Sequence, residues 1–504
     1  MNTTTGTVSR IILGSCNSQH HEHQPLWPVV QSRNPTSFVW AGDAVYADDR
    51  KVEKQILDAS PEYLKHLLQE QRNEPGYKSL LESGVEIFGT IDDHDYGTNN
   101  GDKTFRWRRE NAIEFVNFLD LPDTSPMMKR AAAGLGVYGV QVYDFNEPNP
   151  RKRLLSDEAA GLDPDVVPDL DPSATQEPLS IGNRLVAVFV LDVRSNRTPW
   201  PKTLKEKVMN KNDGCMLGDE QFKWFETAIG RSNATVNIIV TGLQVHAERY
   251  YDSAKVENWN GFPKSQHRLY QALLQPNVRA PIVISGDVHH AQLLRKDCRQ
   301  RGSNTLRPLY EVTTSGMTHS WGSVETSTCG RIRLGRLCNV TYMNHAKRFV
   351  LHFAHHIFPW NELIVDDDSN QMQYTLNLNV AELEFDWEDR QVFTRILGHK
   401  GQTILEQRWP FRSLTSIEET MVADRDFQSL SHRLQRQATI IDQDDWICVH
   451  YTGSPSPVSF AMASIATASL VSILLSAPLL IPILLLWLLL TKRRKRSSSK
   501  QKSE

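Results

Sequence analysis

Residues 86–100 read EIFGTIDDHDYGTNN, and this stretch carries the pattern on which the fold prediction depends. It begins as a short apolar run and then breaks into Asp92, Asp93, His94 and Asp95. A short apolar run of this kind is typical of a strand that is buried on both faces of a sheet. We therefore predict a strand that ends just before the acidic cluster.

The same pattern recurs along the chain. Further apolar runs that end in polar or metal-binding residues are IILGSC (11–16), SFVWAGD (37–43), LVAVFVLDVR (185–194), VNIIVTGLQ (236–244) and PIVISGDVHH (281–290). Helix-like stretches lie between some of them, such as SPEYLKHLLQEQ (60–71), which opens with a Ser-Pro pair, and LGDEQFKWFETAIG (217–230). Alternating strands and helices predict the α/β class, with a site at the carboxyl ends of the strands.

The remaining segments divide the chain further. Residues 147–180 are rich in proline and aspartate and are predicted to be an exposed insertion. Residues 373–412 alternate in polarity, which predicts antiparallel strands that close the domain of residues 8–412. Residues 413–457 form a polar peripheral segment and linker, with a helix expected over 413–450.

The C-terminal region predicts a membrane anchor. No residue from 458 to 490 is charged, and about 20 apolar residues suffice to cross a bilayer as a helix. Pro478 and Pro482 are tolerated in such a helix. Because the tail of residues 491–504 is strongly basic, we expect it in the cytosol, with the rest of this single-pass chain on the other side.

The compartment is less strongly indicated. Sequons at Asn2, Asn196, Asn233 and Asn339 suit a lumenal domain, and the final KQKSE resembles the dilysine retrieval signal of endoplasmic-reticulum membrane proteins. These features favour an endomembrane location. No signal peptide opens the sequence, however, so a tail-anchored protein with its globular part in the cytosol stays an alternative.

Charge and cysteines exclude two classes. A net charge of −3 gives no basic excess, so no nucleic-acid partner is expected. The chain has six cysteines but no C-x-x-C pair, which argues against a structural zinc site. Cys329 and Cys338 lie close in sequence and could form a disulfide in an oxidising compartment.

The predicted strand ends collect residue types that bind metals. They are Cys16, Asp43, the Asp92–Asp95 cluster, Asn99, Arg194, Gln244, His246, Asp287, His289, His290 and His319. Two cations about 4 Å apart can neutralise a phosphate ester and activate water, and they need a bridging carboxylate, for which Asp43 is the candidate. Asp93 and Asn99 suit calcium, magnesium or manganese, whereas imidazole and thiolate suit iron or zinc, so we expect two unlike metals.

The motifs GSC, GDAVYAD, DDHDYGTNN, LDVR, ISGDVHH and TSGMTHSW occur in the order found in alkaline phosphatase D (PhoD-like) metallophosphatases. The chain resembles this family over roughly residues 8 to 400. The resemblance implies a metallophosphoesterase fold, a four-layer α/β/β/α sandwich, and hydrolysis of phosphomonoesters and phosphodiesters with iron and calcium.

The resemblance also implies roles for single residues. Its metal ligands would be Cys16, Asp43, Asp93, Asn99, Asp287 and His289. Arg194 would hold a phosphate oxygen through its guanidinium fork. The bacterial iron enzymes use a further tyrosine, for which Tyr46, Tyr63 and Tyr77 are unproven counterparts.

Several histidines have two interpretations. His94 is a candidate general acid or a hydrogen-bonded structural residue, and His319 either contacts the substrate or stabilises a turn. The cluster of His20, His21 and His23 is expected to be a solvated loop.

The sequence therefore predicts a metal-dependent phosphoric ester hydrolase, in which a metal-bound hydroxide attacks phosphorus at a dinuclear site. The leaving oxygen would take a proton from His94, His289 or water. The predicted anchor places the phosphate-ester substrate, which could be lipid-linked, near a bilayer. The alternatives are a phospholipid-directed phosphodiesterase and an inactive phosphatase-fold protein that binds partners.

Overall fold

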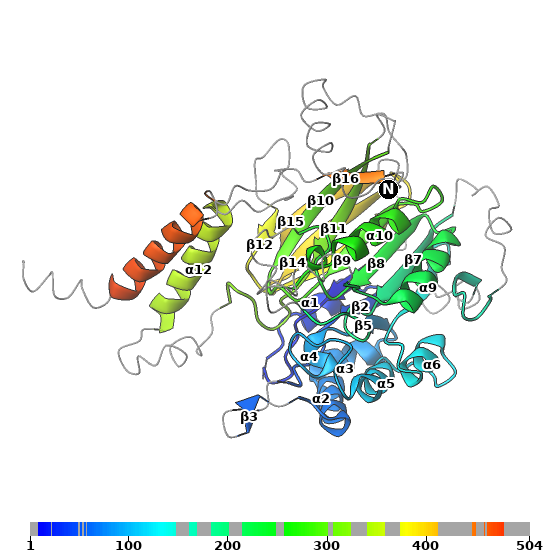
Figure 1. Ribbon diagram of the computed structural model, residues 1–504, viewed down its shortest axis with the longest axis horizontal. Coiled ribbons are helices and arrows are strands. Elements are labelled where there is room, and N and C mark those ends of the chain that lie inside the picture. The colour runs from blue at the N-terminus through cyan, green and yellow to red at the C-terminus, as the bar shows by residue number, and fades with distance from the viewer. Residues whose placement is uncertain are drawn as a thin grey trace, which may run out of the picture. The chain divides into compact units, whose positions relative to one another are not determined.

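A computed structural model describes the elements that build the site (Figure 1). The described residues are 9–21, 23–48, 51–52, 55–56, 58–147, 161–168, 183–200, 214–247, 257–300, 306–323, 340–357, 373–411, 446–449, 458 and 461–477. They fall into a larger unit, Met1–Ser323 with Asn361–Gly453, and a smaller unit, Val324–Trp360 with Ser454–Glu504.

The first sheet of the larger unit has the strand order β15-β14-β13-β1-β2-β5. Its parallel strands are β1 (Arg10–Gly14), β2 (Ser37–Ala41) and β5 (Glu86–Thr90). Its antiparallel strands are β13 (Asn379–Asp386), β14 (Gln391–Gly398) and β15 (Thr403–Pro410). The antiparallel strands predicted over 373–412 are thus confirmed.

The second sheet has eight strands, with the order β12-β10-β11-β9-β8-β7-β6 and β16 added beside β10. They are β6 (Gly139–Asp144), β7 (Leu185–Leu191), β8 (Val236–Thr241), β9 (Pro281–Ser285), β10 (Ala291–Gln300), β11 (Leu306–Thr313), β12 (Tyr374–Thr375) and β16 (Trp446–Val449). Strands β7, β8, β9 and β11 are parallel neighbours, as the predicted buried runs require.

Some helices of the larger unit begin at a residue whose side chain caps them. They are α1 (Trp27–Ser32), α2 (Pro61–Asn73), α3 (Pro75–Glu82), α4 (Asp93–Tyr96), α5 (Arg108–Phe118), α6 (Pro126–Ala132), α9 (Asp219–Gly230) and α10 (Pro263–Leu273). A 3-10 turn, η3 (Trp259–Gly261), precedes α10, and a small ribbon joins β3 (Lys51–Val52) to β4 (Gln55–Ile56). The Ser60 side chain caps α2 by accepting from the Tyr63 backbone N–H.

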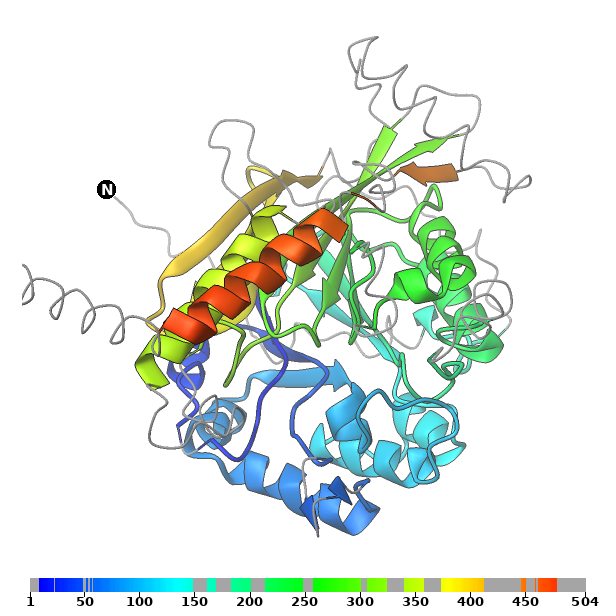
Figure 2. The ribbon, with the colours of Figure 1, turned by 60° about the vertical axis from the view of Figure 1, so that its left-hand side comes forward.

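Alternate side chains of β7 divide the core in two. Val186, Val188 and Val190 belong to a cluster with β1, β2, β5 and helices α1 to α6. Ala187, Phe189 and Leu191 belong to a second cluster with α9 and α10. The two sheets therefore pack against each other, with helices on their outer faces (Figure 2). This confirms a mixed α/β fold with two sheets.

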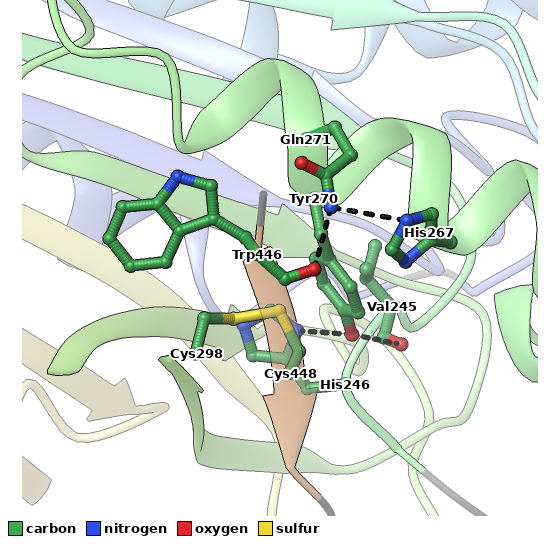
Figure 3. The surroundings of a disulfide bond; sticks show 8 residues. All are labelled: Val245, His246, His267, Tyr270, Gln271, Cys298, Trp446 and Cys448. Atoms are coloured by element: carbon green, nitrogen blue, oxygen red, sulfur yellow. Dashed lines mark hydrogen bonds between the residues drawn. A yellow bond between two sulfur atoms is a disulfide. The ribbon is translucent and has the colours of Figure 1, made fainter. Parts of the chain in front are cut away.

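A disulfide closes the far end of the second sheet. Cys298 in β10 is bonded to Cys448 in β16, and Gln271 of α10 donates to the Trp446 carbonyl at 2.9 Å (Figure 3). The helix expected over 413–450 is wrong at its end, where residues 446–449 are instead a strand paired with β10. The Cys329–Cys338 pairing lies outside the described residues.

Part of the predicted insertion at 147–180 is packed within the larger unit. Asp163 is 3% exposed and pairs with the buried Arg130. It also accepts from the Trp224 indole N–H at 2.9 Å. This contact ties residues 161–168 to α6 and α9.

The smaller unit contains α12 (Val340–Ile357) and a helix over 461–477, which lie side by side in Figures 1 and 2. The Tyr342 hydroxyl donates to the Leu474 carbonyl at 2.7 Å. Within the described ranges, none of the helices has the length and apolar character needed to span a bilayer. Residues 459–460 and 478–490 of the predicted anchor lie outside those ranges.

Candidate metal centre

The backbone is strained where the predicted ligands follow their strands. Cys16 after β1, Asp43 after β2 and Asp287 after β9 have φ values of +55°, +52° and +68°, and His289 has +53°. Residues other than glycine rarely adopt this left-handed conformation, and such strain gathers at functional sites. Four of the predicted site residues therefore share the left-handed backbone conformation, which a polar side chain does not by itself require.

The first group of donors surrounds Asp43. The Cys16 sulfur and the Tyr46 hydroxyl each lie 3.4 Å from Asp43 Oδ2, and Ser315 Oγ lies 3.0 Å from the same sulfur. The backbone N–H of His94 donates to the other Asp43 oxygen at 3.2 Å. A sulfur, a phenol and a carboxylate thus meet in one buried place.

Two sets of side chains are close enough to share a cation. In one set, Asp43, Asp93 and His94 offer ligand atoms within 4.8 Å of one another, and in the other, Asp92, Asp93 and Asp287 do so. Asp93 belongs to both sets. Two neighbouring cation positions with a shared carboxylate are the arrangement that a dinuclear centre needs.

The electrostatics of the cluster favour a bound cation. Burial raises the pKa of Asp43 well above its usual value, and burial with the charges of Asp92 and Asp93 does the same to the pKa of Asp287. Burial also raises the pKa of the Cys16 thiol to about 11. A cation among these groups would favour their charged forms, so the donor set fits a metal.

Two buried oxygens in the cluster support the same conclusion. Asp92 Oδ2 and Asp93 Oδ1 accept no hydrogen bond from the part of the chain that the structure describes. Buried carboxylate oxygens normally have a partner, and a metal ion is one such partner. Asp92 was not among the predicted ligands, although it stands in the DDHD cluster that the sequence had singled out.

His94 lies at the edge of the centre. Its Nδ1 is 2.6 Å from Asp48 Oδ1, and its Nε2 is 3.9 Å from Asp93 Oδ1. Burial lowers the pKa of His94, but the charges of Asp93 and Asp43 and the contact with Asp48 outweigh burial and raise that pKa well above its usual value. An imidazole beside the metal candidates and paired with Asp48 is placed to carry a proton in the reaction.

Arg194 is buried and bonded to carboxylates, whereas a side chain that binds phosphate on an open surface would be exposed. The residue is 0% exposed, and its Nε donates to Asp92 Oδ1 at 2.5 Å. A second nitrogen donates to the buried carboxylate of Glu257. The guanidinium is thus committed to carboxylates beneath the centre.

Asn99 lies on the outer side of the loop that follows Asp93. It is exposed and lines an open hollow of about 670 Å³ with neighbours that include Arg106 and Trp200. The next residue, Asn100, donates its backbone N–H to Asp93 Oδ2 at 2.7 Å. The hollow and the metal candidates therefore share one short loop.

Aromatic and imidazole rings gather beside the donors. The Tyr46 ring stacks on His94 with centroids 4.0 Å apart and meets His319 at 4.8 Å. The His319 ring lies 4.6 Å from His289 and 6.0 Å from the parallel ring of His21. His21 is exposed, as expected for a solvated loop. Its ring nevertheless stacks against His319, a candidate substrate-binding residue.

Other predicted residues lie away from the two donor sets. His246 is buried, and its Nδ1 lies 3.1 Å from the Tyr270 hydroxyl. His290 is buried with its Nδ1 2.9 Å from the Val288 carbonyl. Sequence reasoning missed Glu257 and Arg197, which stand in none of the quoted motifs. It also missed Ser315, which stands in TSGMTHSW but was not singled out there.

The chain was compared with solved structures and with curated proteins. One similar solved structure is described as "Structure of PhoD"; it is 13% identical, the alignment covers 86% of this chain and 78% of that chain, and the TM-score is 0.45. Another is a purple acid phosphatase, PPD1, from yellow lupin (Lupinus luteus) seeds. It is 9% identical, the alignment covers 82% of this chain and 55% of that chain, and the TM-score is 0.42. A search among curated proteins found no match.

The sequence itself matches a family model. Residues 173–351 match the model described as PhoD-like phosphatase. The matched region holds Arg194, Asp287, His289 and His319, whereas Cys16, Asp43 and Asp93 precede it. This partial match supports the activity of a phosphoric ester hydrolase.

Proposed function

We propose that this chain hydrolyses phosphate esters at a dinuclear metal centre held by Cys16, Asp43, Asp92, Asp93 and Asp287. The observation that supports this most directly is the position of Asp93, which belongs to both sets of potential ligands. When bound, the cations would supply Lewis acidity that lowers the pKa of water and neutralises phosphate oxygens. We infer that the layers of the domain follow the four-layer metallophosphoesterase plan.

The residues around the centre would handle the substrate. His94, paired with Asp48 and 3.9 Å from Asp93, would protonate the leaving oxygen. The rings of His289 and His319 lie side by side and would orient the phosphate. The hollow lined by Asn99, Arg106 and Trp200 would accept the organic group of the ester.

Replacement of Asp43 by Asn tests this function. The variant keeps the size of the side chain but removes a buried carboxylate from one of the two ligand sets, so bound metal and hydrolysis should fall together, the rate by about 100-fold or more. The measurements are metal content of the purified full chain and hydrolysis of a monoester and a diester side by side. A variant that keeps full activity contradicts the proposal, and wild-type protein without metal favours a partner-binding role instead.

We further propose that the hydrolase acts next to a membrane, on lipid-linked esters or phospholipid head groups. Support comes from the uncharged run of residues 458–490 and from its exposed apolar side chains, among them Val458, Met462 and Ile465. In this proposal the chain is a single-pass endomembrane protein whose basic tail is cytosolic. The preference for a diester over a monoester in the paired assay separates a phosphodiesterase from a phosphatase.

A further inference from the structure

A buried glutamate lies between two buried arginines beneath the candidate centre. Glu257, which precedes η3, is 3% exposed, and Arg194 and Arg197 are 0% exposed. One Glu257 oxygen accepts from Arg194 Nη1, and the other lies 2.7 Å from Arg197 Nη1. Glu257 is thus a carboxylate partner that the two arginines share.

Arg194 carries this contact to the metal candidates. Its Nε donates to Asp92 at 2.5 Å, while its Nη2 lies 3.8 Å from Asp93 Oδ1 and 3.9 Å from Asp287 Oδ1. These three aspartates are the members of one potential ligand set. The Arg194 guanidinium therefore lies close to every carboxylate of that set. Its hydrogen bond to Glu257 holds it in this position.

Arg197 carries the contact to the loop after Asp93. Its Nη2 donates to the carbonyls of Asn100 and Gly101 at 2.7 and 2.8 Å. Asn100 in turn donates its backbone N–H to Asp93 Oδ2. Glu257 is thus linked to Asp93 by two routes, one through a side chain and one through the backbone.

We propose that Glu257 is a positioning residue of the metal centre and that Arg194 acts as an internal counter-cation rather than as a phosphate ligand. This inference rests on the proposed function, because it needs a centre to position. Without the glutamate, two buried guanidinium groups would lose a shared partner and would draw more strongly on the metal-binding aspartates. Partners that orient metal ligands typically change metal affinity 10- to 100-fold when they are removed.

The test is titration of the metal-free full chain with Mn²⁺ by calorimetry. Glu257→Gln should weaken Mn²⁺ binding by about 10- to 100-fold. Glu257→Asp keeps the charge and shortens the reach, so it should weaken binding less. If Glu257→Gln does not fold, the Mn²⁺ affinity of Glu257→Asp tests the inference.

Asp163→Asn is the matched control, because Asp163 and Arg130 form a buried ion pair elsewhere in the same unit. It should lower thermal stability but leave Mn²⁺ affinity within about twofold of wild type. Equal affinity in wild type and in both Glu257 variants overturns the inference, as does equal weakening in the control. Wild-type protein that binds no Mn²⁺ counts against the proposed function itself.

Discussion

Cys16 contributes sulfur to a cluster in which the other close donors are mainly oxygens. Soft thiolate selects zinc or iron, whereas calcium prefers oxygen ligands. We therefore expect Cys16→Ser to weaken Zn²⁺ binding at least tenfold and to leave Ca²⁺ binding nearly unchanged, as measured by competition with a chelating dye. Cys215→Ser is the control, because Cys215 is a free, half-buried cysteine whose sulfur accepts from the Gly218 backbone.

Prediction at the residue scale depended on motifs. Cys16, Asp43, Asp93 and Asp287 could be singled out because each follows an apolar run. The burial of Arg194 could not be foreseen, because one of its two hydrogen-bonded carboxylates, Glu257, is distant in sequence and belongs to no motif. Ser315 stands in the TSGMTHSW motif, but it lies beside Cys16 only in the folded chain.

At the scale of elements, a buried glutamate in β13 joins three parts of the first sheet and its surroundings. The Glu382 carboxylate is 0% exposed and accepts from Arg33 after α1 at 2.5 and 2.7 Å and from Arg395 in β14 at 2.8 Å. Arg10 in β1 lies 3.6 Å away. Because the arginines are partly exposed, we expect Glu382→Gln to lower the free energy of unfolding by about 2 kcal/mol at neutral pH.

The difference in unfolding free energy between wild type and Glu382→Gln should depend on pH. Burial raises the pKa of Glu382, but hydrogen bonds from Arg33 and Arg395 outweigh burial, so the folded-state pKa lies below its usual value. The stabilisation is therefore complete above the unfolded pKa of about 4.3 and is lost as the pH falls through the lower folded value. Denaturant unfolding at several pH values should show wild type and Glu382→Gln converging below about pH 4. A gap that stays constant down to pH 3 would contradict this account.

Elements were predictable where local signals were strong. The buried runs at 185–191 and 281–285 are strands, and the Ser60 cap opens α2, because burial and capping act over a few residues. Strand β16 was not predictable, because four residues carry little periodicity. Its pairing with β10 and the disulfide to Cys298 join residues that are 150 positions apart.

At the scale of the whole molecule, the sequence joins a phosphatase domain to an apolar C-terminal segment. Val458, Met462, Ile465 and Ile473 are each more than 60% exposed, although apolar side chains of this size are usually buried. Contiguous exposed apolar surface is typical of a binding surface for a membrane or a protein. Within the smaller unit, the Tyr342–Leu474 hydrogen bond joins α12 to this segment.

We predict that the full chain floats with phospholipid vesicles in a density gradient and that a chain ending at residue 457 does not. Burial of roughly 20 apolar residues in lipid is effectively irreversible, so high salt should not release the full chain, whereas it would release a protein held only by the basic tail. Hydrolysis of a soluble ester should be the same in both forms, since the candidate ligands Cys16, Asp43, Asp93 and Asp287 are retained. Flotation of the shortened chain, or release of the full chain by salt, would contradict anchoring by residues 458–490 and leave the phosphoesterase proposal in place.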